Sequence, residues 1–144
     1  MLVVSLVGCG GTEYEDTNGE NNYALQTITD ENIINLETGA SGLSFSEEDF
    51  GGIISTEYSS KNFNGVEQIY TTSFIGSADV TVYIGTMNVK GGNFKLVAIN
   101  NDTIIKEFPL DAFAETYVFE DIKGTFSIHL AGENASFEFS IEIY

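Results

Sequence analysis

The sequence predicts an all-β protein, an antiparallel β-sandwich of about seven to nine strands with little helix. Three observations support this fold class. Beyond Leu43, apolar residues recur at every second position, as in strands that bury one face. Short apolar stretches are separated by glycine, asparagine and aspartate, which favour turns. No long amphipathic helix pattern competes with the strands.

The first element, residues 25–36, fits two structures. Thr29-Asp30-Glu31 has the composition of a helix cap, and a short helix would carry the apolar residues behind it. The adjacent Ile33-Ile34 and the following Thr38-Gly39 suit a strand equally well. We expect a strand here, with the helix as the alternative.

The middle of the chain predicts a series of short strands. In the segment 80–89, Gly85 shifts the apolar positions from even to odd numbers, which predicts a β-bulge. Glycine pairs and asparagines predict turns at 51–52, 90–93 and 100–102. Residues 46–49 and 110–114 are the remaining helix candidates, each about one turn long. The expected strands cover residues 53–58, 66–74, 80–89, 94–99, 103–108 and 117–119.

The C-terminal part predicts two half-buried strands joined by a hairpin turn at Ala131-Gly132-Glu133. In the first strand, His129 and its same-phase neighbours Thr125 and Ser127 are expected to face solvent. The residues expected to face the core are Phe126, Ile128, Leu130, Phe137, Phe139, Ile141 and Ile143. In its pattern, the segment 93–143 resembles the C-terminal sheets of small jelly-roll or immunoglobulin-like modules of secreted bacterial proteins.

The N-terminal stretch contains the only cysteine, at the end of a short apolar run. The quartet Leu6-Val7-Gly8-Cys9 resembles the lipobox of bacterial lipoproteins. This resemblance implies cleavage before Cys9 by signal peptidase II, a diacylglyceryl thioether on Cys9, and attachment to the bacterial cell membrane or cell surface outside the cytoplasm. The alternative is a buried N-terminal strand that ends in an incidental cysteine.

This interpretation divides the chain into three parts. Residues 1–8 are a truncated remnant of a signal peptide, residues 9–24 a flexible acidic tether, and residues 25–144 the folded β domain. With a single cysteine, the domain can form no intramolecular disulfide and depends on its core.

The charge of the chain excludes one class of partner. The formal net charge is −17, with 22 acidic residues, five lysines and no arginine. Phosphate backbones would repel such a protein, so we expect no nucleic-acid binding. Cationic or neutral partners fit this charge better.

The sequence contains no recognisable catalytic motif, so we expect no enzyme and no cofactor. It has no G-x-S-x-G motif and no phosphate-binding loop, and its single histidine, His129, has no orienting acid in the pattern. The acidic run Glu47-Glu48-Asp49 is the candidate for a calcium site. Tyr83 and Tyr117 are the candidates for stacking on a ligand such as a sugar ring.

These observations favour a membrane-anchored, extracytoplasmic module that binds a protein or peptide. A glycan-binding module is the first alternative, since exposed tyrosines can stack on sugars. A small hydrolase that uses surface carboxylates is the second, and it needs a pocket with at least two converging acids.

Overall fold

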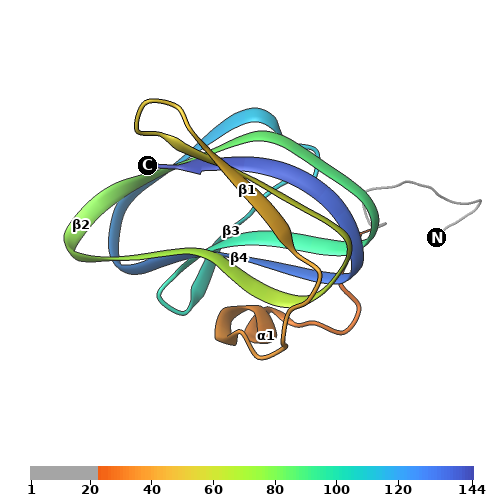
Figure 1. The fold of residues 1–144 in the computed structure, drawn as a ribbon. Coiled ribbons are helices and arrows are strands. Elements are labelled where there is room, and N and C mark those ends of the chain that lie inside the picture. Colours follow the sequence, from red (N-terminus) through yellow and green to blue (C-terminus); the bar gives the residue numbers. More distant parts are fainter. Residues whose placement is uncertain (1–22) are drawn as a thin grey trace, which may run out of the picture.

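The computed structural model describes residues 23–144 and is almost entirely β-sheet (Figure 1). One short helix precedes four strands, which form a single antiparallel sheet. This confirms the all-β antiparallel prediction, but the strands are fewer and longer than the predicted seven to nine. Their bounds are α1 (Asp30–Asn35), β1 (Ser44–Asp49), β2 (Ile54–Asn100), β3 (Thr103–Glu107) and β4 (Phe113–Ile143).

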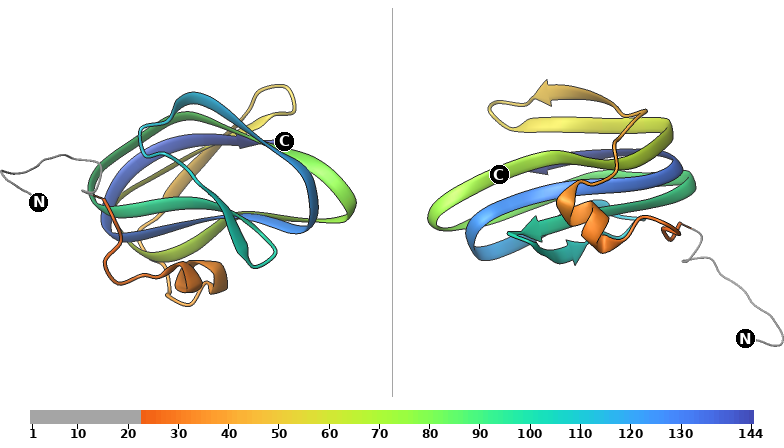
Figure 2. Two further views of the ribbon diagram at one scale, coloured as in Figure 1. Left: turned by 180° about the vertical axis from the view of Figure 1, so that it is seen from behind. Right: turned by 90° about the horizontal axis from the view of Figure 1, so that it is seen from below.

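Strands β2 and β4 form one long antiparallel ribbon that is wound so that β2 passes β4 twice (Figures 1 and 2). The first half of β2 pairs with β4 from Ser55–Glu142 to Thr86–Phe113. The second half pairs with β4 again, from Val82–Ile143 to Asn100–Phe126. The C-terminal half of β4 therefore lies between the two halves of β2. At the borders, β1 pairs with the start of β2 and β3 with its end.

The turns predicted at 90–93 and at Ala131-Gly132-Glu133 are wrong, because the chain bends there without reversing. Both segments lie inside continuous strands whose register shifts locally. Gly92 has a φ of +72°, and a Cβ at Gly92 would lie 2.1 Å from the carbonyl oxygen of Asn134. These residues permit a sharp bend between closely spaced strands, which is why they look like turn residues in the sequence.

Two turns and one bulge are where the sequence places them. Gly51 and Gly52, both with positive φ, join β1 to β2, and Asn101, also with positive φ, lies in the turn from β2 to β3. The register of β2 against β4 shifts between Ile84 and Thr86, as predicted for a bulge at Gly85.

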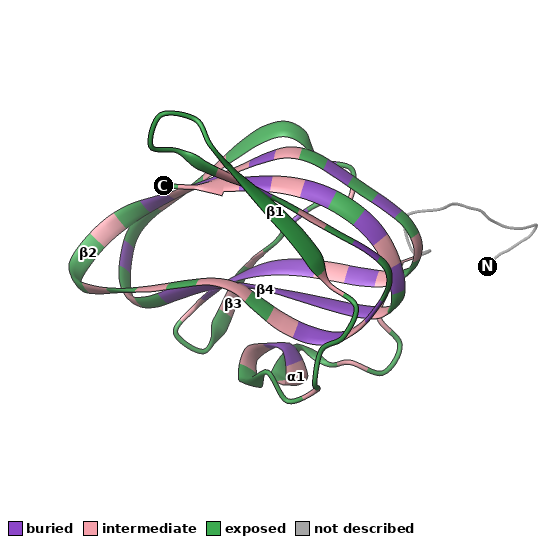
Figure 3. Ribbon diagram, viewed as in Figure 1, coloured by how far each residue is buried: buried purple, intermediate pink, exposed green. Residues whose placement is uncertain are grey.

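The core is formed by the alternating apolar residues of the ribbon, as the colouring by burial shows (Figure 3). Phenylalanine rings form its centre: Phe94 and Phe137 have ring centroids 4.4 Å apart, and Phe137 and Phe139 are 5.8 Å apart. Of the seven residues expected to face the core, Ile143 is partly buried. The other six are buried: Phe126, Ile128, Leu130, Phe137, Phe139 and Ile141.

The strand expected within residues 25–36 is wrong, and the helical alternative is correct. Thr29 and Asn32 form a reciprocal capping box, in which each side chain accepts a hydrogen bond from the main chain of the other. The helix is held in place because Ile33 is buried against a second apolar cluster on the sheet, made of Val66, Val97, Ile99 and Ala131. The other helix candidates are also wrong, since residues 46–49 lie in β1, residues 110–112 form a turn, and residues 113–114 begin β4.

Helix α1 also explains why His129 is not solvated as predicted. The His129 side chain points to the face covered by α1, and the residue is only 3% exposed. Its Nδ1 donates to the carbonyl oxygen of Ile33 at 2.7 Å, and its Nε2 lies 3.3 Å from Gln68 Oε1. Burial lowers the pKa of His129 below its usual value, although the contact with Ile33 acts in the opposite direction. Ser127, also expected to face solvent, is buried on this face.

The segment ahead of α1 is fixed to the sheet by one carboxylate. Glu133 accepts hydrogen bonds from the main-chain N–H groups of Gln26, Thr27 and Ile28, from the Thr27 hydroxyl and from the Asn93 amide, at 2.7–3.0 Å. Desolvation raises the pKa of Glu133, but these donors outweigh it and lower the pKa to about 2. An ion pair also joins α1 to the sheet, since Lys95 of β2 lies 3.0 Å from Asp30, the first residue of α1.

Within residues 23–144, we find no helix that combines the length and the apolar character needed to cross a membrane.

Candidate functional site

The predicted lipidation site cannot be placed, because Cys9 and the preceding Leu6, Val7 and Gly8 lie outside the described residues. The described part of the chain begins with Tyr23, whose carbonyl oxygen accepts a hydrogen bond from the Phe94 N–H at 2.9 Å.

The calcium candidates Glu47, Glu48 and Asp49 are successive residues of β1, so their side chains alternate between the two faces of the sheet. Asp49 has a local role, because its Oδ1 accepts a hydrogen bond from the Gly52 N–H at 2.7 Å and stabilises the β1–β2 turn. In the described part of the chain, no three Asp, Glu, His or Cys side chains gather as metal ligands would.

The two candidate stacking residues, Tyr83 and Tyr117, lie on opposite faces of the sheet. Tyr117 is the register partner of Val82, the buried neighbour of Tyr83 in the chain. Its ring packs against Phe108 with centroids 5.0 Å apart, and the Lys106 ammonium lies 5.2 Å from the ring centroid. Desolvation, together with the hydrogen bond and charge of Glu115, raises the pKa of Tyr117 to about 12. The two tyrosines therefore form no common platform for a sugar.

Strand β1 lies at one end of the sheet and leaves an open edge there. Strand β1 pairs only with β2, and no other strand of residues 23–144 lies along its outer side (Figure 2). The Phe50 N–H donates to the Ile53 carbonyl at 2.9 Å, so Phe50 and Ile53 are a hydrogen-bonded pair of the β1–β2 ladder. Along an antiparallel ladder, every second residue forms such a pair, and the residues between them direct their main-chain groups away from the partner strand. It follows that Phe45, Glu47 and Asp49 direct their main-chain N–H and C=O groups to the open edge.

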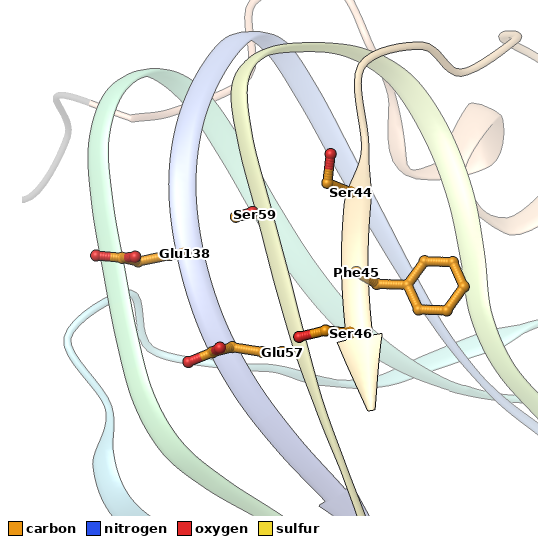
Figure 4. A pocket seen from close by; sticks show the side chains of 6 residues that line it. All are labelled: Ser44, Phe45, Ser46, Glu57, Ser59 and Glu138. Atoms are coloured by element: carbon orange, nitrogen blue, oxygen red, sulfur yellow. The ribbon is translucent and has the colours of Figure 1, made fainter. Parts of the chain in front are cut away.

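Large apolar side chains are exposed around this edge. Phe45 is 64% exposed and Phe50 is 60% exposed, and Ile53 and Ile54 on the other side of the hairpin are also exposed. In Figure 4, the Phe45 ring points away from the Ser46 and Glu57 side chains, towards the face that carries the core. Such a concentration of apolar side chains beside an unpaired edge is typical of an interaction site.

An open groove of about 280 Å³ adjoins the edge on the same face as Phe45. Tyr58 lies half-buried within it, and its hydroxyl is 3.5 Å from the carbonyl oxygen of Ile69. Burial raises the pKa of Tyr58, as do the negative charges of Glu47 and Glu67. The residues that line the groove are Glu47, Ile54, Thr56, Tyr58, Ile69, Tyr70, Ile141 and Ile143.

The opposite face carries a polar depression in which Glu57 and Glu138 lie near three serines (Figure 4). A neighbouring hollow of about 420 Å³ adds Asp111 and the exposed Phe113. The hydrolase hypothesis requires one carboxylic acid whose pKa is raised by an apolar, water-free surrounding. Glu57 is exposed, and the Glu138 side chain is 52% exposed and paired with Lys90 at 3.2 Å. This surrounding does not favour hydrolase chemistry.

The chain matches no known protein-family model and no curated protein. The edge of β1 and the groove beside it are therefore the features that indicate a function.

Neither the open edge nor the groove was predicted from the sequence. The groove exists because the winding of the ribbon brings residues 54–58 of β2 together with residues 69–70 and the end of β4. The pattern contained one signal for the edge: Phe45 and Phe50 lie on either side of the acidic run, and a glycine pair follows Phe50.

Proposed function

We propose that the protein is an interaction module that binds an extended peptide segment along the open edge of β1. The observation that carries this proposal is the combination of unpaired main-chain groups on β1 with the exposed Phe45, Phe50 and Ile54 around them. Addition of a peptide strand to an open sheet edge is a common mode of recognition, in which main-chain hydrogen bonds supply affinity and side-chain pockets supply specificity.

The acidic residues of β1 favour a foreign strand over a second copy of this chain. In an antiparallel pairing of β1 with a second copy along its full length, Glu47 of each copy would lie diagonal to Glu48 of the other. Like charges across a strand pair are destabilising, and charged edge strands protect proteins from aggregation. A partner strand that carries basic residues would be attracted by these carboxylates, whereas a second copy of β1 would be repelled by them.

We further propose that the module is a bacterial lipoprotein, anchored outside the cytoplasm through a lipid on Cys9. The support is the sequence alone, since Leu6-Val7-Gly8-Cys9 has the pattern of a lipobox. We also propose that the wound ribbon is a sandwich of the jelly-roll or immunoglobulin-like type. The support is the proximity of two parts of β2, since the Tyr58 hydroxyl lies 3.5 Å from the carbonyl oxygen of Ile69 and both residues line the groove.

The edge pairing can be tested with two variants of one residue. Glu47→Pro and Glu47→Gln both remove the carboxylate, but only proline also removes the N–H at the open edge. Peptides would be selected from a phage-displayed random dodecapeptide library against the wild-type protein, and their affinities for both variants measured by calorimetry. We expect affinity for Glu47→Pro to be about tenfold lower than for Glu47→Gln, because one strand hydrogen bond is lost.

Circular dichroism and thermal unfolding of both variants would show that β1 remains folded. If the library yields no binding peptide, or if the two variants bind the selected peptides equally well, the edge of β1 is not the binding site.

The anchor can be tested by metabolic labelling with a fatty-acid analogue in a bacterial host. The gene would carry a complete signal peptide ahead of Leu2, and the comparison is between the wild type and Cys9→Ala. We expect label and membrane association in the wild type and neither in Cys9→Ala, because the thiol is the acceptor of the lipid. Equal labelling of the two proteins would refute the anchor.

A further inference from the structure

We propose that the groove beside β1 holds the side chain of a lysine or arginine from the bound peptide, with the aliphatic stem against the groove walls and the cationic head group between Glu47 and Glu67. This inference rests on the proposed function, because the peptide strand paired with β1 presents the side chain.

The walls of the groove suit an aliphatic stem. Ile54, Ile69, Ile141 and Ile143 supply apolar surface, and Tyr58 and Tyr70 supply aromatic rings. The volume of about 280 Å³ lies at the lower end of the range of small-molecule sites, which fits one long side chain better than a larger ligand. Lysine and arginine bury their stems along such surfaces and keep their charged ends in water.

The electrostatics of the groove favour a cation. Glu47 lines the groove, and its charge and that of Glu67 both act on the Tyr58 hydroxyl. Glu67 lies opposite Leu130 in the register, and Leu130 belongs to the core, so Glu67 points to the same face as Tyr58. A cation placed here would lie beside the Glu47 carboxylate and near the charge of Glu67, and both carboxylates attract it.

The lysines of the chain leave this charge uncompensated. None of the five lysines lines the groove. Lys90 pairs with Glu138, Lys95 pairs with Asp30 and Glu107, and Lys106 lies over Tyr117. Glu47 and Glu67 form no salt bridge in the part of the chain that the structure describes. A basic side chain from a partner would therefore not have to displace a lysine of this chain from either carboxylate.

The edge of β1 places a partner side chain within reach of the groove. A strand paired with β1 would lie about 4.8 Å beyond it, and its side chains would alternate between the two faces as those of β1 do. The residue opposite Glu47 would point to the face of Phe45 and Tyr58. From that position, a long side chain passes Glu47 and enters the groove, whereas a short one ends at the rim.

The test uses the peptides selected against the wild-type protein. We expect each to contain a lysine or arginine whose replacement by norleucine, which keeps the stem and removes the charge, lowers affinity at least tenfold. In the double variant Glu47→Gln/Glu67→Gln, this ratio should fall below about threefold, because no carboxylate remains at the head group. The matched control, Glu48→Gln/Glu57→Gln, removes two charges from the opposite face and should keep the tenfold ratio.

The outcomes separate the two proposals. If norleucine peptides bind the wild type as tightly as lysine peptides, the groove proposal is wrong, although a weakened Glu47→Pro variant would still support pairing at β1. If the two double variants lose the lysine preference equally, the effect is one of net charge and the groove is not the site. If Glu47→Pro binds the peptides as tightly as Glu47→Gln does, while the wild type shows the lysine preference, strand pairing is wrong and the groove binds the cation by another route. Thermal unfolding of both double variants controls for loss of fold.

Discussion

Gly65→Ala is expected to lower the free energy of unfolding by more than about 3 kcal/mol, the largest effect that we expect for any single methyl group in this protein. Gly65 lies in β2 with a φ of +108°, a conformation that side chains disfavour. A Cβ at this position would lie 1.7 Å from the carbonyl oxygen of Gly39 and 2.9 Å from the Ala40 Cα. Both contacts are with main chain, so relief requires that the segment ahead of β1 move away from the sheet.

Two other glycines separate the causes of this effect. At Gly51, φ is +70° and a Cβ would meet no atom within 4 Å, so Gly51→Ala measures the backbone strain alone, about 1 kcal/mol. Gly91 has neither a positive φ nor a close neighbour, so Gly91→Ala should be nearly neutral. Chemical denaturation of the three variants gives the comparison. A loss at Gly65→Ala no larger than that at Gly51→Ala would show that the close approach of Gly39 is not rigid.

Glu133→Ala is expected to cost about 2–4 kcal/mol and to release the segment ahead of α1 from the sheet. The variant removes a carboxylate that accepts five hydrogen bonds, and hydrogen bonds to charged groups are among the strongest in proteins. Release of this segment would uncover the apolar cluster around Val66 and Val97. Hydrogen exchange is the direct measurement, since protection should fall first in residues 26–28 and in α1.

The pH dependence of stability provides an independent test of Glu133. Its pKa is about 2 in the folded protein and about 4.5 as a free side chain, so the unfolded chain binds a proton more readily. The stabilisation is therefore complete above pH 4.5 and is lost as the pH falls towards 2. Glu133→Gln keeps one acceptor oxygen but has no charge to titrate. Its stability relative to the wild type should recover as the pH falls from 5 to 2, and a constant difference would show that the charge does not matter.

The sequence predicted the composition of the strands better than their connections. Two-residue periodicity correctly identified the buried faces of residues 126–130 and 137–141, because burial depends on which side chains face the core. The same pattern could not distinguish a turn from a bend. The Gly91-Gly92 pair and the Gly132–Asn134 stretch contain residues with positive φ, which either reverse a chain or bend it, and only the neighbouring strands decide the outcome.

His129 shows a second reason why prediction from the sequence failed: a distant segment of the chain covers the face on which this residue lies. Alternation correctly placed it on the face opposite Ile128 and Leu130, but that face is buried because α1 and the segment ahead of it lie on top. The cover depends on the hydrogen bonds of Glu133 to residues 26–28, more than 100 positions away in the chain. The groove beside β1 escaped prediction for the same reason, since residues from two parts of β2 and from β4 meet there only after the ribbon winds.

The central place of the C-terminal half of β4 has a consequence for biogenesis. Residues 126–142 have a neighbouring strand on each side, and both neighbours are synthesised earlier. During translation, most of the ladder of the first half of β2 therefore cannot form until residues 126–142 have left the ribosome. Folding is expected to be late and all-or-none, with slow kinetics because the contacts span most of the chain. A nascent chain in which residues 126–142 have not yet been released would remain accessible to chaperones and proteases.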